Sequence, residues 1–341
     1  MDHFKRRLRV AHIIPSLGVG GVEVGIAKSY SELSQHFDYQ LFYVKSPGKL
    51  KFKQCSVLKL LIRTALKQWQ VDIVVTSLWA AHPFGFIFQR MGVKWIAFYH
   101  SGGIVHWLES LIFSIAWKRA DMRMVDSRNC GLVMTQLFGD RSWRVVNYYF
   151  PVADKAKPWR SRNFDISFVG RSDPVKRLDL VAKLVQQYAE LRPDFRAIFI
   201  LSGPSPRFLI NFAKRYPTGV LIRNDVANST VHKILADSRF FVLMSDVEGF
   251  SMATAEAVMA CAIPVVRPVG EIGSYVSSES GIIISDVSSS ELRKAAERMV
   301  SLASQENYAN KMTQVGRAYL STRHESYCDS FLRCIEEFAL N

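Results

Sequence analysis

The chain has 341 residues, of which 49% are hydrophobic and 22% charged, so it is long enough for two domains and too apolar for a disordered protein. Five cysteines without a Cys-x-x-Cys pair argue against a disulfide framework or a zinc site and favour a reducing compartment. The net charge of +14 is uneven, because residues 1–160 hold 23 Lys/Arg and 10 Asp/Glu whereas residues 161–341 hold 21 and 20. Charge confined to one half favours an anionic surface as partner over nucleic acid, for which no binding motif is present.

The apolar run after the basic residues 5–7 is predicted to be a first strand, because Pro15 and the glycines that follow interrupt it too early for a signal peptide. Residues 17–25 form a glycine-rich turn that opens a helix. Gly20 and Gly21 lie in this turn, but the dinucleotide fingerprint lacks its last glycine, so an oxidoreductase is not favoured. The alternative is that these glycines serve only a tight strand-to-helix turn. The lipid-like stretch 104–117 is too short to cross a bilayer.

Strands are then expected at residues 39–44, 72–77, 94–99, 120–127 and 144–147, and helices at 49–70, 101–119 and 129–138. In helix 49–70 we expect cations on one side (Lys59, Arg63, Lys67) and apolar residues on the other (Leu58, Ile62, Leu66, Trp69). The aromatic helix 101–119 is expected to fill the core or an acceptor pocket. His100 ends a strand, where open α/β sheets place ligands, although a purely structural role is the alternative; His82 is a weaker candidate.

The second half begins after a linker at residues 151–162, with a strand at 164–169 that delivers Gly170, Arg171 and Lys176 to a loop before a helix. Two cations at that place suit a diphosphate, since Arg offers a bidentate fork and Lys a point charge. A surface charge cluster without function is the alternative. Further helices are expected at 178–192, 230–236, 290–302, 306–319 and 325–340, and strands at 197–202, 219–223 and 281–285.

A strand at residues 240–244, a loop, a helix and a strand at 264–266 form the most informative unit. The loop holds Glu248, Gly249 and Phe250; Ser251 is expected to be the N-cap of a helix that carries Glu256. A helix N-terminus binds anions, and carboxylates accept hydrogen bonds from sugar hydroxyls. The alternative is one more βαβ unit with two solvated glutamates.

This unit resembles the Glu-x7-Glu signature of retaining glycosyltransferase family 4, through Glu248-Gly249-Phe250, Glu256-Ala257 and Pro264-Val265-Val266. The resemblance implies the GT-B architecture, an α/β fold with two Rossmann-like domains whose parallel sheets face a central cleft. It implies that Glu248 contacts the donor sugar and that Glu256 contacts the ribose. It also implies that the helix N-terminus, together with Gly249, Phe250 and Ser251, binds the diphosphate.

The same resemblance extends to other segments. The Gly20-Gly21 turn would lie against donor phosphate and acceptor, and His100 near the donor sugar. Gly170-Arg171 and Lys176 match the family's Gly-Arg…Lys-Gly motif, with Arg177 where glycine is usual. Residues 270–274 depart from the family's Gly-Gly-x-Pro-Glu pattern.

We therefore expect an acceptor domain at residues 1–152, to which a C-terminal helix at 325–341 returns, and a donor domain at 160–324. The expected activity is retaining, metal-independent hexosyl transfer from a nucleoside diphosphate sugar, without a cofactor, to a lipid-linked or cell-surface saccharide. The alternatives are a non-catalytic GT-B partner of a polysaccharide-assembly complex and a related sugar-nucleotide epimerase or phosphorylase. The basic half predicts a cytoplasmic protein attached to the inner face of an anionic membrane. Base, sugar, acceptor and linkage are left open.

Overall fold

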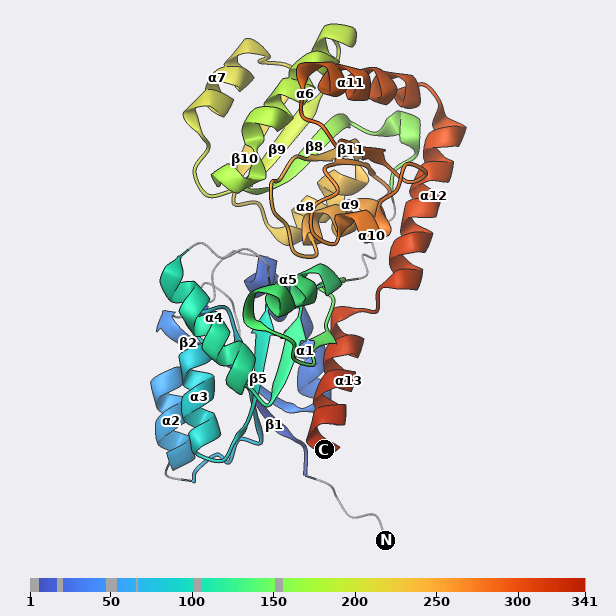
Figure 1. Cartoon of the computed structure of the whole chain (residues 1–341). Helices are drawn as coiled ribbons and strands as arrows, with labels where there is room; N and C mark the ends of the chain where they lie inside the picture. The colour runs from blue at the N-terminus through green and yellow to red at the C-terminus, as the bar shows by residue number, and fades with distance from the viewer. Residues whose placement is uncertain are drawn as a thin grey trace. The chain divides into compact units, whose positions relative to one another are not determined.

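The structure, a computed structural model, describes residues 6–16, 21–46, 54–65, 67–100, 106–150 and 156–340, except for the side chains at positions 46 and 54. The chain divides into two compact units, each with its own parallel sheet (Figure 1). The N-terminal unit comprises Met1–Tyr148 and Ser326–Asn341, and the C-terminal unit comprises Tyr149–Glu325. None of the helices described is long and apolar enough to cross a bilayer.

The N-terminal sheet has seven strands in the order β3-β2-β1-β4-β5-β6-β7, and all of its pairings are parallel. Its strands are β1 (Arg9–Ser16), β2 (Asp38–Ser46), β3 (Gln54–Ser56), β4 (Ile73–Ser77), β5 (Lys94–Tyr99), β6 (Met122–Val125) and β7 (Arg144–Val145). The chain leaves β1 toward β2 and later returns to the other side of β1 with β4. This reversal is the place where open α/β sheets bind ligands, at the carboxyl ends of the strands.

Two sets of helices cover this sheet. One face is covered by α2 (Val57–Ala65), α3 (His82–Arg90), α4 (Trp107–Arg119) and α5 (Arg128–Phe138). Val57, Leu60 and Phe88 pack there with Ala11 and Ile13 of β1, and Phe113 and Trp117 pack with the residues of β5. Because side chains alternate along a strand, His12 points to the opposite face.

On that opposite face lie α1 (Gly21–His36) and the last helix, α13 (Tyr327–Leu340), which contact one another (Figure 1). The Phe331 ring of α13 stacks on His12 at 6.1 Å between ring centroids.

The helix predicted at residues 49–70 is wrong in extent. Residues 54–56 form the edge strand β3, and the helix α2 covers only Val57–Ala65. Its buried residues are Val57 and Leu60, whereas Leu58 and Ile62 are exposed by 63% and 51%. The sequence Leu-Lys-Leu-Leu-Ile is apolar on more than one side, so its periodicity did not define the face that packs on the sheet. Position 66 and residues 47–53 lie outside the described part of the chain.

The aromatic helix also differs from its prediction. Helix α4 begins at Trp107, and positions 101–105 are outside the described residues. Phe113 and Trp117 are core residues, as expected, but Trp107 is 78% exposed.

The C-terminal sheet has six parallel strands in the order β10-β9-β8-β11-β12-β13. They are β8 (Phe164–Arg171), β9 (Ala197–Ser202), β10 (Val220–Asn224), β11 (Ser238–Leu243), β12 (Ile263–Val266) and β13 (Ile282–Ile283). The helices are α6 (Leu178–Leu191), α7 (Arg207–Arg215), α8 (Asn228–Ala236), α9 (Met252–Met259), α10 (Ile272–Tyr275), α11 (Ser289–Ala303) and α12 (Glu306–Arg323), with short 3-10 turns at Trp159–Ser161 and Pro174–Lys176.

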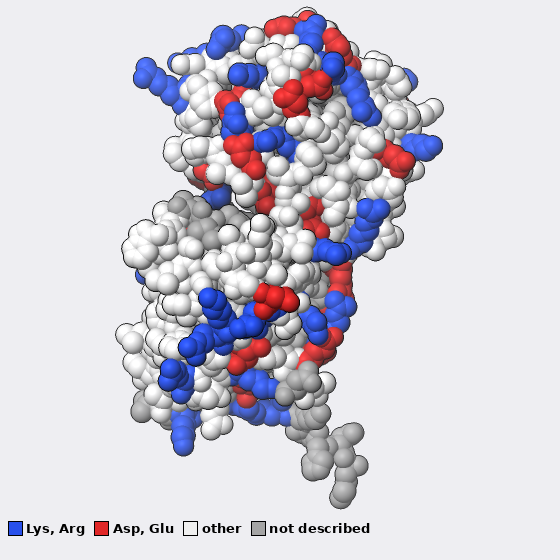
Figure 2. Space-filling model, in the orientation of Figure 1, with Lys and Arg blue, Asp and Glu red and all other residues white. Residues whose placement is uncertain are grey.

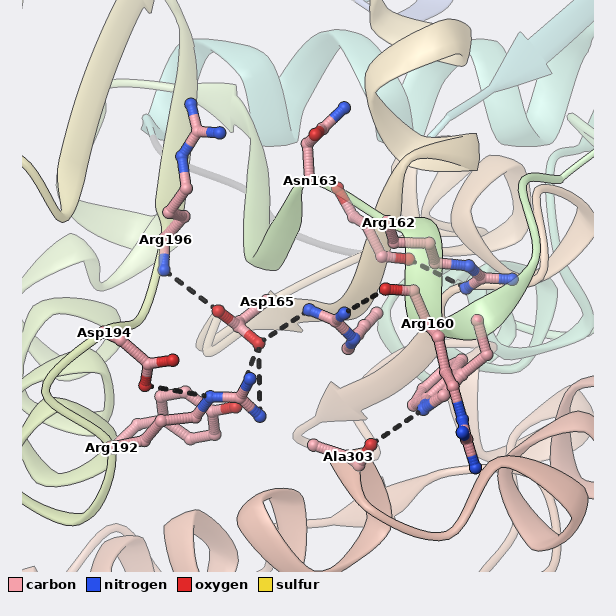
Figure 3. A network of polar contacts seen from close by, with 12 residues as sticks. Arg160, Arg162, Asn163, Asp165, Arg192, Asp194, Arg196 and Ala303 are labelled. Atoms are coloured by element: carbon pink, nitrogen blue, oxygen red, sulfur yellow. Dashed lines mark hydrogen bonds and ion pairs between the residues drawn. The ribbon is translucent and has the colours of Figure 1, made fainter.

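A buried carboxylate fixes the start of β8. Asp165, with a side chain 5% exposed, accepts hydrogen bonds from Arg239 Nη1 at 2.9 Å, from the Arg196 backbone N–H at 3.0 Å and from the Tyr188 hydroxyl at 3.3 Å (Figure 3). Arg192 Nη1 adds an ion pair at 3.8 Å. The network joins β8, β11 and α6 at the end of the sheet opposite to the ligand-binding edge, so its role is structural.

Candidate active site

Three loops meet at the carboxyl edge of the C-terminal sheet. They follow β8, β11 and β12, which are adjacent strands, and the reversal of strand order falls between β8 and β11. The loops after β8 and β11 are tied together, because the Asp246 backbone N–H donates to the Val175 carbonyl at 2.9 Å. The side chains that the sequence singled out on these two loops therefore share one corner of the sheet.

Lys176 and Glu248 form the centre of this corner. Lys176 Nζ lies 2.7 Å from Glu248 Oε1, and the two side chains are only 16% and 8% exposed. Sequence reasoning gave the two residues separate roles, one at the phosphate and one at the sugar. In the structure they are joined by a charge-assisted hydrogen bond. A diphosphate that takes Lys176 as its counter-charge must therefore compete with this carboxylate.

More cations surround the pair. Arg177 pairs with Asp179 at 3.0 Å and with Asp246 at 3.4 Å, and the hydrogen bond to Asp179 raises the pKa of the Arg177 guanidinium. Arg267, which sequence reasoning missed although it directly follows β12, donates to Asp246 and to the Ser245 carbonyl. Asp246 thus holds two guanidinium groups near the carboxyl edge.

Arg177 also has an unusual backbone conformation. Its φ of 47° and ψ of 50° lie in the left-handed region, which glycine enters without cost. This geometry explains physically why a glycine is usual at this position in the sequence motif that the loop resembles. Its pairing with Asp179 and Asp246 fixes the arginine side chain in place.

Helix α9 begins directly after the Glu248 loop. Ser251 occupies the N-cap position, as predicted, but it is left-handed at φ 63° and its side chain does not cap the helix. Its hydroxyl instead bonds the Thr254 hydroxyl at 2.9 Å. The first helical bond runs from the Ala255 N–H to the Ser251 carbonyl, so the preceding N–H groups of α9 have no acceptor within the helix. Such groups can bind an anion.

Residues 270–275 support the loop from the other side, although their sequence departs from the family pattern. Gly270 has φ 61°, and a Cβ there would lie 2.3 Å from the Glu248 carbonyl oxygen, so only glycine fits. The Glu271 N–H donates to the Gly249 carbonyl at 2.9 Å, and the Tyr275 hydroxyl donates to the Phe250 carbonyl at 2.8 Å. Phe250 itself is a buried residue that packs on Tyr275. The segment therefore holds Gly249 and Phe250 in place.

The loop after β8 contributes less regular features. Arg171 is 64% exposed and pairs with Asp173 at 3.1 Å. Gly170 lies in β8, where a Cβ would meet the Phe168 ring at 2.9 Å, so packing alone requires it.

Two buried polar atoms, Asp173 Oδ1 and Ser245 Oγ, have no hydrogen-bond partner among the described residues. Buried polar atoms are normally satisfied, so these two mark a place for a ligand or water. Nothing in the sequence distinguished them.

Glu256 lies inside α9 with a side chain 10% exposed. Its Oε1 is 3.4 Å from His232 Nε2 of α8, a partner that sequence reasoning also missed. Among the residues that the structure describes, no group of three or more His, Cys, Asp or Glu side chains is arranged to hold a metal ion.

In the N-terminal unit, His100 follows β5, as predicted. Both of its ring nitrogens are buried and lack a hydrogen-bond partner within the described ranges, and burial lowers its pKa well below the usual value. The ring is therefore neutral and packs on Phe98 and Tyr148. His82 instead bonds the Thr76 hydroxyl at 2.9 Å, which favours the structural role for it. Gly21 is the first residue of α1, and Gly20 lies outside the described residues.

Two doubly wound parallel sheets of this kind, one in each unit, define the GT-B fold. Residues 151–318, just under half of the chain, match the sequence model of the family "Glycosyl transferases group 1". Fold and family match together support a GT-B glycosyltransferase. None of the curated proteins matches the chain.

Solved structures with the same fold share little sequence with this chain. HepE from Anabaena, solved in complex with UDP, is 14% identical with a TM-score of 0.77, and the match covers 98% of this chain and 100% of HepE. Sucrose-phosphate synthase from Thermosynechococcus elongatus is 14% identical with a TM-score of 0.73, over 97% and 98%. TarM is 14% identical with a TM-score of 0.66; 79% of this chain matches, spanning 55% of TarM. At these identities the likeness shows the fold alone.

Proposed function

We propose that the protein transfers a hexosyl group from a nucleoside diphosphate sugar to a saccharide acceptor, with retention at the anomeric carbon. The observation that carries the proposal is the pairing of Lys176 with Glu248 at the strand reversal, beside the N-terminus of α9. A cation, a carboxylate and the N-terminal N–H groups of a helix are the groups that would bind the phosphates and the hydroxyls of a sugar diphosphate. The match to the group 1 family and the presence of UDP in the HepE structure support this choice of donor.

Each side chain has a separate role in this proposal. Lys176, Arg171 and the N-terminus of α9 stabilise the charge that develops on the diphosphate as the bond between its oxygen and the anomeric carbon breaks. Glu248 accepts hydrogen bonds from the transferred sugar, and Glu256 from the ribose. Lys176 is released to the phosphate when the sugar takes over Glu248.

Transfer proceeds on the face that the diphosphate leaves. The acceptor oxygen forms its bond to the anomeric carbon, and its proton passes to an oxygen of the departing phosphate. No pair of protein carboxylates of the glycosidase kind is then required. The cations serve as the counter-charge of the diphosphate, so the reaction is metal-independent in this proposal, and neutral His100 hydrogen-bonds the donor or acceptor sugar.

The acceptor is a lipid-linked or cell-surface saccharide, and the protein works at the inner face of a membrane. The support for this part is the charge of +13 in residues 1–160. A non-catalytic GT-B partner is not favoured, because Gly270 and Tyr275 still hold the Glu248 loop in place despite their altered surroundings.

A ligand screen tests the donor. UDP-, GDP- and ADP-sugars are added to the protein one at a time, and the melting temperature is followed, because a ligand that binds only the folded state raises it. One nucleotide class should raise the melting temperature, and Lys176→Met should abolish the rise. Lys183→Met, an exposed lysine of the neighbouring helix α6, is the matched control and should keep it. NMR of the product then reports the anomeric configuration; no shift with any donor would refute the proposal.

A further inference from the structure

One face of the N-terminal unit is unusually apolar for a surface. Of the sixteen large hydrophobic side chains exposed among the described residues, ten lie on α2, α3, α4 and α5 or directly after α3. Helix α4 shows this most clearly, since Trp107, Leu108, Leu111 and Ile115 are exposed by 78%, 40%, 50% and 46%. These four helices cover one face of the sheet together. Scattered exposed apolar residues are normal, but their concentration on one face indicates a binding surface.

The charges on the helices of this face are mostly positive. Its four helices carry six cations, Lys59, Arg63, Arg90, Lys118, Arg119 and Arg128, and one anion, Glu109. The two helices of the opposite face, α1 and α13, carry two cations and five anions, Lys28, Arg333, Glu23, Glu32, Asp329, Glu336 and Glu337. Figure 2 shows one side of this unit, on which Lys and Arg atoms gather with Asp and Glu atoms among them. The charge on the helices of this unit is therefore unevenly distributed. The apolar face is cationic, and the opposite face is anionic.

We infer that the outer face of α2–α5 docks the protein on an anionic lipid bilayer. Leu, Ile and Trp side chains interleaved with Lys and Arg are the composition that lies in a membrane interface, with the apolar groups inserted and the cations at the headgroups. Charge complementarity selects a lipid surface that is anionic. The anionic face of α1 and α13 is repelled by the same surface, so the two faces together define which side of the unit meets the membrane.

This inference assigns a surface to the proposed membrane association, and it rests on that part of the proposed function alone. Vesicle binding is measured without a nucleotide sugar, so its failure would leave the proposed transfer untouched. Leu58 and Ile62 of α2 belong to this exposed face.

The test is cosedimentation of the full chain with vesicles. The wild-type protein should bind vesicles that contain phosphatidylglycerol and not pure phosphatidylcholine. Lys118→Gln/Arg119→Gln should lower the partition coefficient roughly twenty-five-fold, since each cation near an anionic surface changes it roughly fivefold. Leu108→Ser/Leu111→Ser/Ile115→Ser should lower it roughly tenfold or more through lost insertion. Raising salt from about 0.1 to 0.5 M should weaken the residual binding of the triple serine variant more than that of the double glutamine variant.

A matched control separates this face from exposed apolar residues in general. Phe208 and Ile210 of α7 are exposed by 44% and 40% and lie beside cations, but they belong to the C-terminal unit. Phe208→Ser/Ile210→Ser should bind vesicles as the wild type does. Far-UV circular dichroism melts establish that every variant is folded.

A second readout reports insertion directly. The tryptophan fluorescence of the wild-type chain should shift to the blue on anionic vesicles and be partly quenched by brominated lipid, and Trp107→Phe should lose both effects while still binding. Unchanged binding of both α4 variants, loss of binding in the α7 control, or a dimer in light scattering that the α4 serines dissociate without any vesicle binding would each overturn the inference.

Discussion

The ion pair between Lys176 and Glu248 makes a quantitative prediction for stability. Their charged atoms lie 2.7 Å apart, and the side chains are 16% and 8% exposed. Lys176→Met removes the cation while keeping the length of the side chain, so it leaves a buried carboxylate without its partner. Removing one member of a buried pair costs about 3–5 kcal/mol of the free energy of unfolding. We expect about 3 kcal/mol, because Lys176 retains some solvent contact.

The other two variants of a double-mutant cycle on Lys176 and Glu248 should behave differently. Glu248→Gln leaves a lysine that can reach water, so its cost should be about 1 kcal/mol. The double variant Lys176→Met/Glu248→Gln buries no unpaired charge and should lie within about 1 kcal/mol of the wild type. The coupling energy between the two positions is then about 3 kcal/mol.

Native-state hydrogen exchange without donor measures these values. The amides of β8 and β11 exchange when the C-terminal unit opens, so they report the unit that holds the pair. A melt of the whole chain is less suitable, because two units need not unfold in one transition. Lys183→Met should change the opening free energy by less than about 0.5 kcal/mol. Strictly additive losses in the double variant would refute the buried-pair reasoning.

Three further predictions concern the site and the fold. In steady-state kinetics Glu248→Gln should chiefly lower kcat and Glu256→Gln chiefly raise the KM for the donor, and near-wild-type kinetics in both would remove the two glutamates from the site. Arg171→Ala should slow transfer roughly a hundredfold and leave the enzyme insensitive to EDTA; a strict need for Mg²⁺ or Mn²⁺ would contradict the role given to the cations. Asp165→Ala should cost about 3–5 kcal/mol of stability by leaving the buried Arg239 without its carboxylate, whereas Asp194→Ala, at a side chain 79% exposed, should cost less than about 0.5 kcal/mol in the same exchange experiment.

The buried strands were the most predictable part of the fold. The bounds of β5 and β9 coincide with the prediction, because each is a continuous apolar run ended by a polar or glycine-containing turn. Helix α3 was missed since a proline and Gly85 interrupt its pattern. Gly85 is needed for packing, because a Cβ there would lie 2.0 Å from Trp95 Nε1. Periodicity describes one helix at a time and contains no information on such a partner.

The candidate site was predictable in its residue types but not in its connections. Lys176 and Glu248 stand out because each follows a buried strand, yet their direct pairing depends on β8 and β11 being neighbours, and the two residues are far apart in the sequence. His232 and the unsatisfied atom of Ser245 carry no sequence signal at all. Arg267 could have been found, because it stands at the carboxyl end of a predicted strand.

Helix α13 belongs to the N-terminal unit, although the ribosome produces it after the whole C-terminal unit. While residues 149–325 are being synthesised, for on the order of ten to thirty seconds, the N-terminal sheet lacks the helix whose Phe331 stacks on His12. The C-terminal unit is continuous in sequence, so its folding does not depend on the missing helix. A released chain truncated after residue 325 should therefore contain a protease-resistant C-terminal unit and a protease-sensitive N-terminal one.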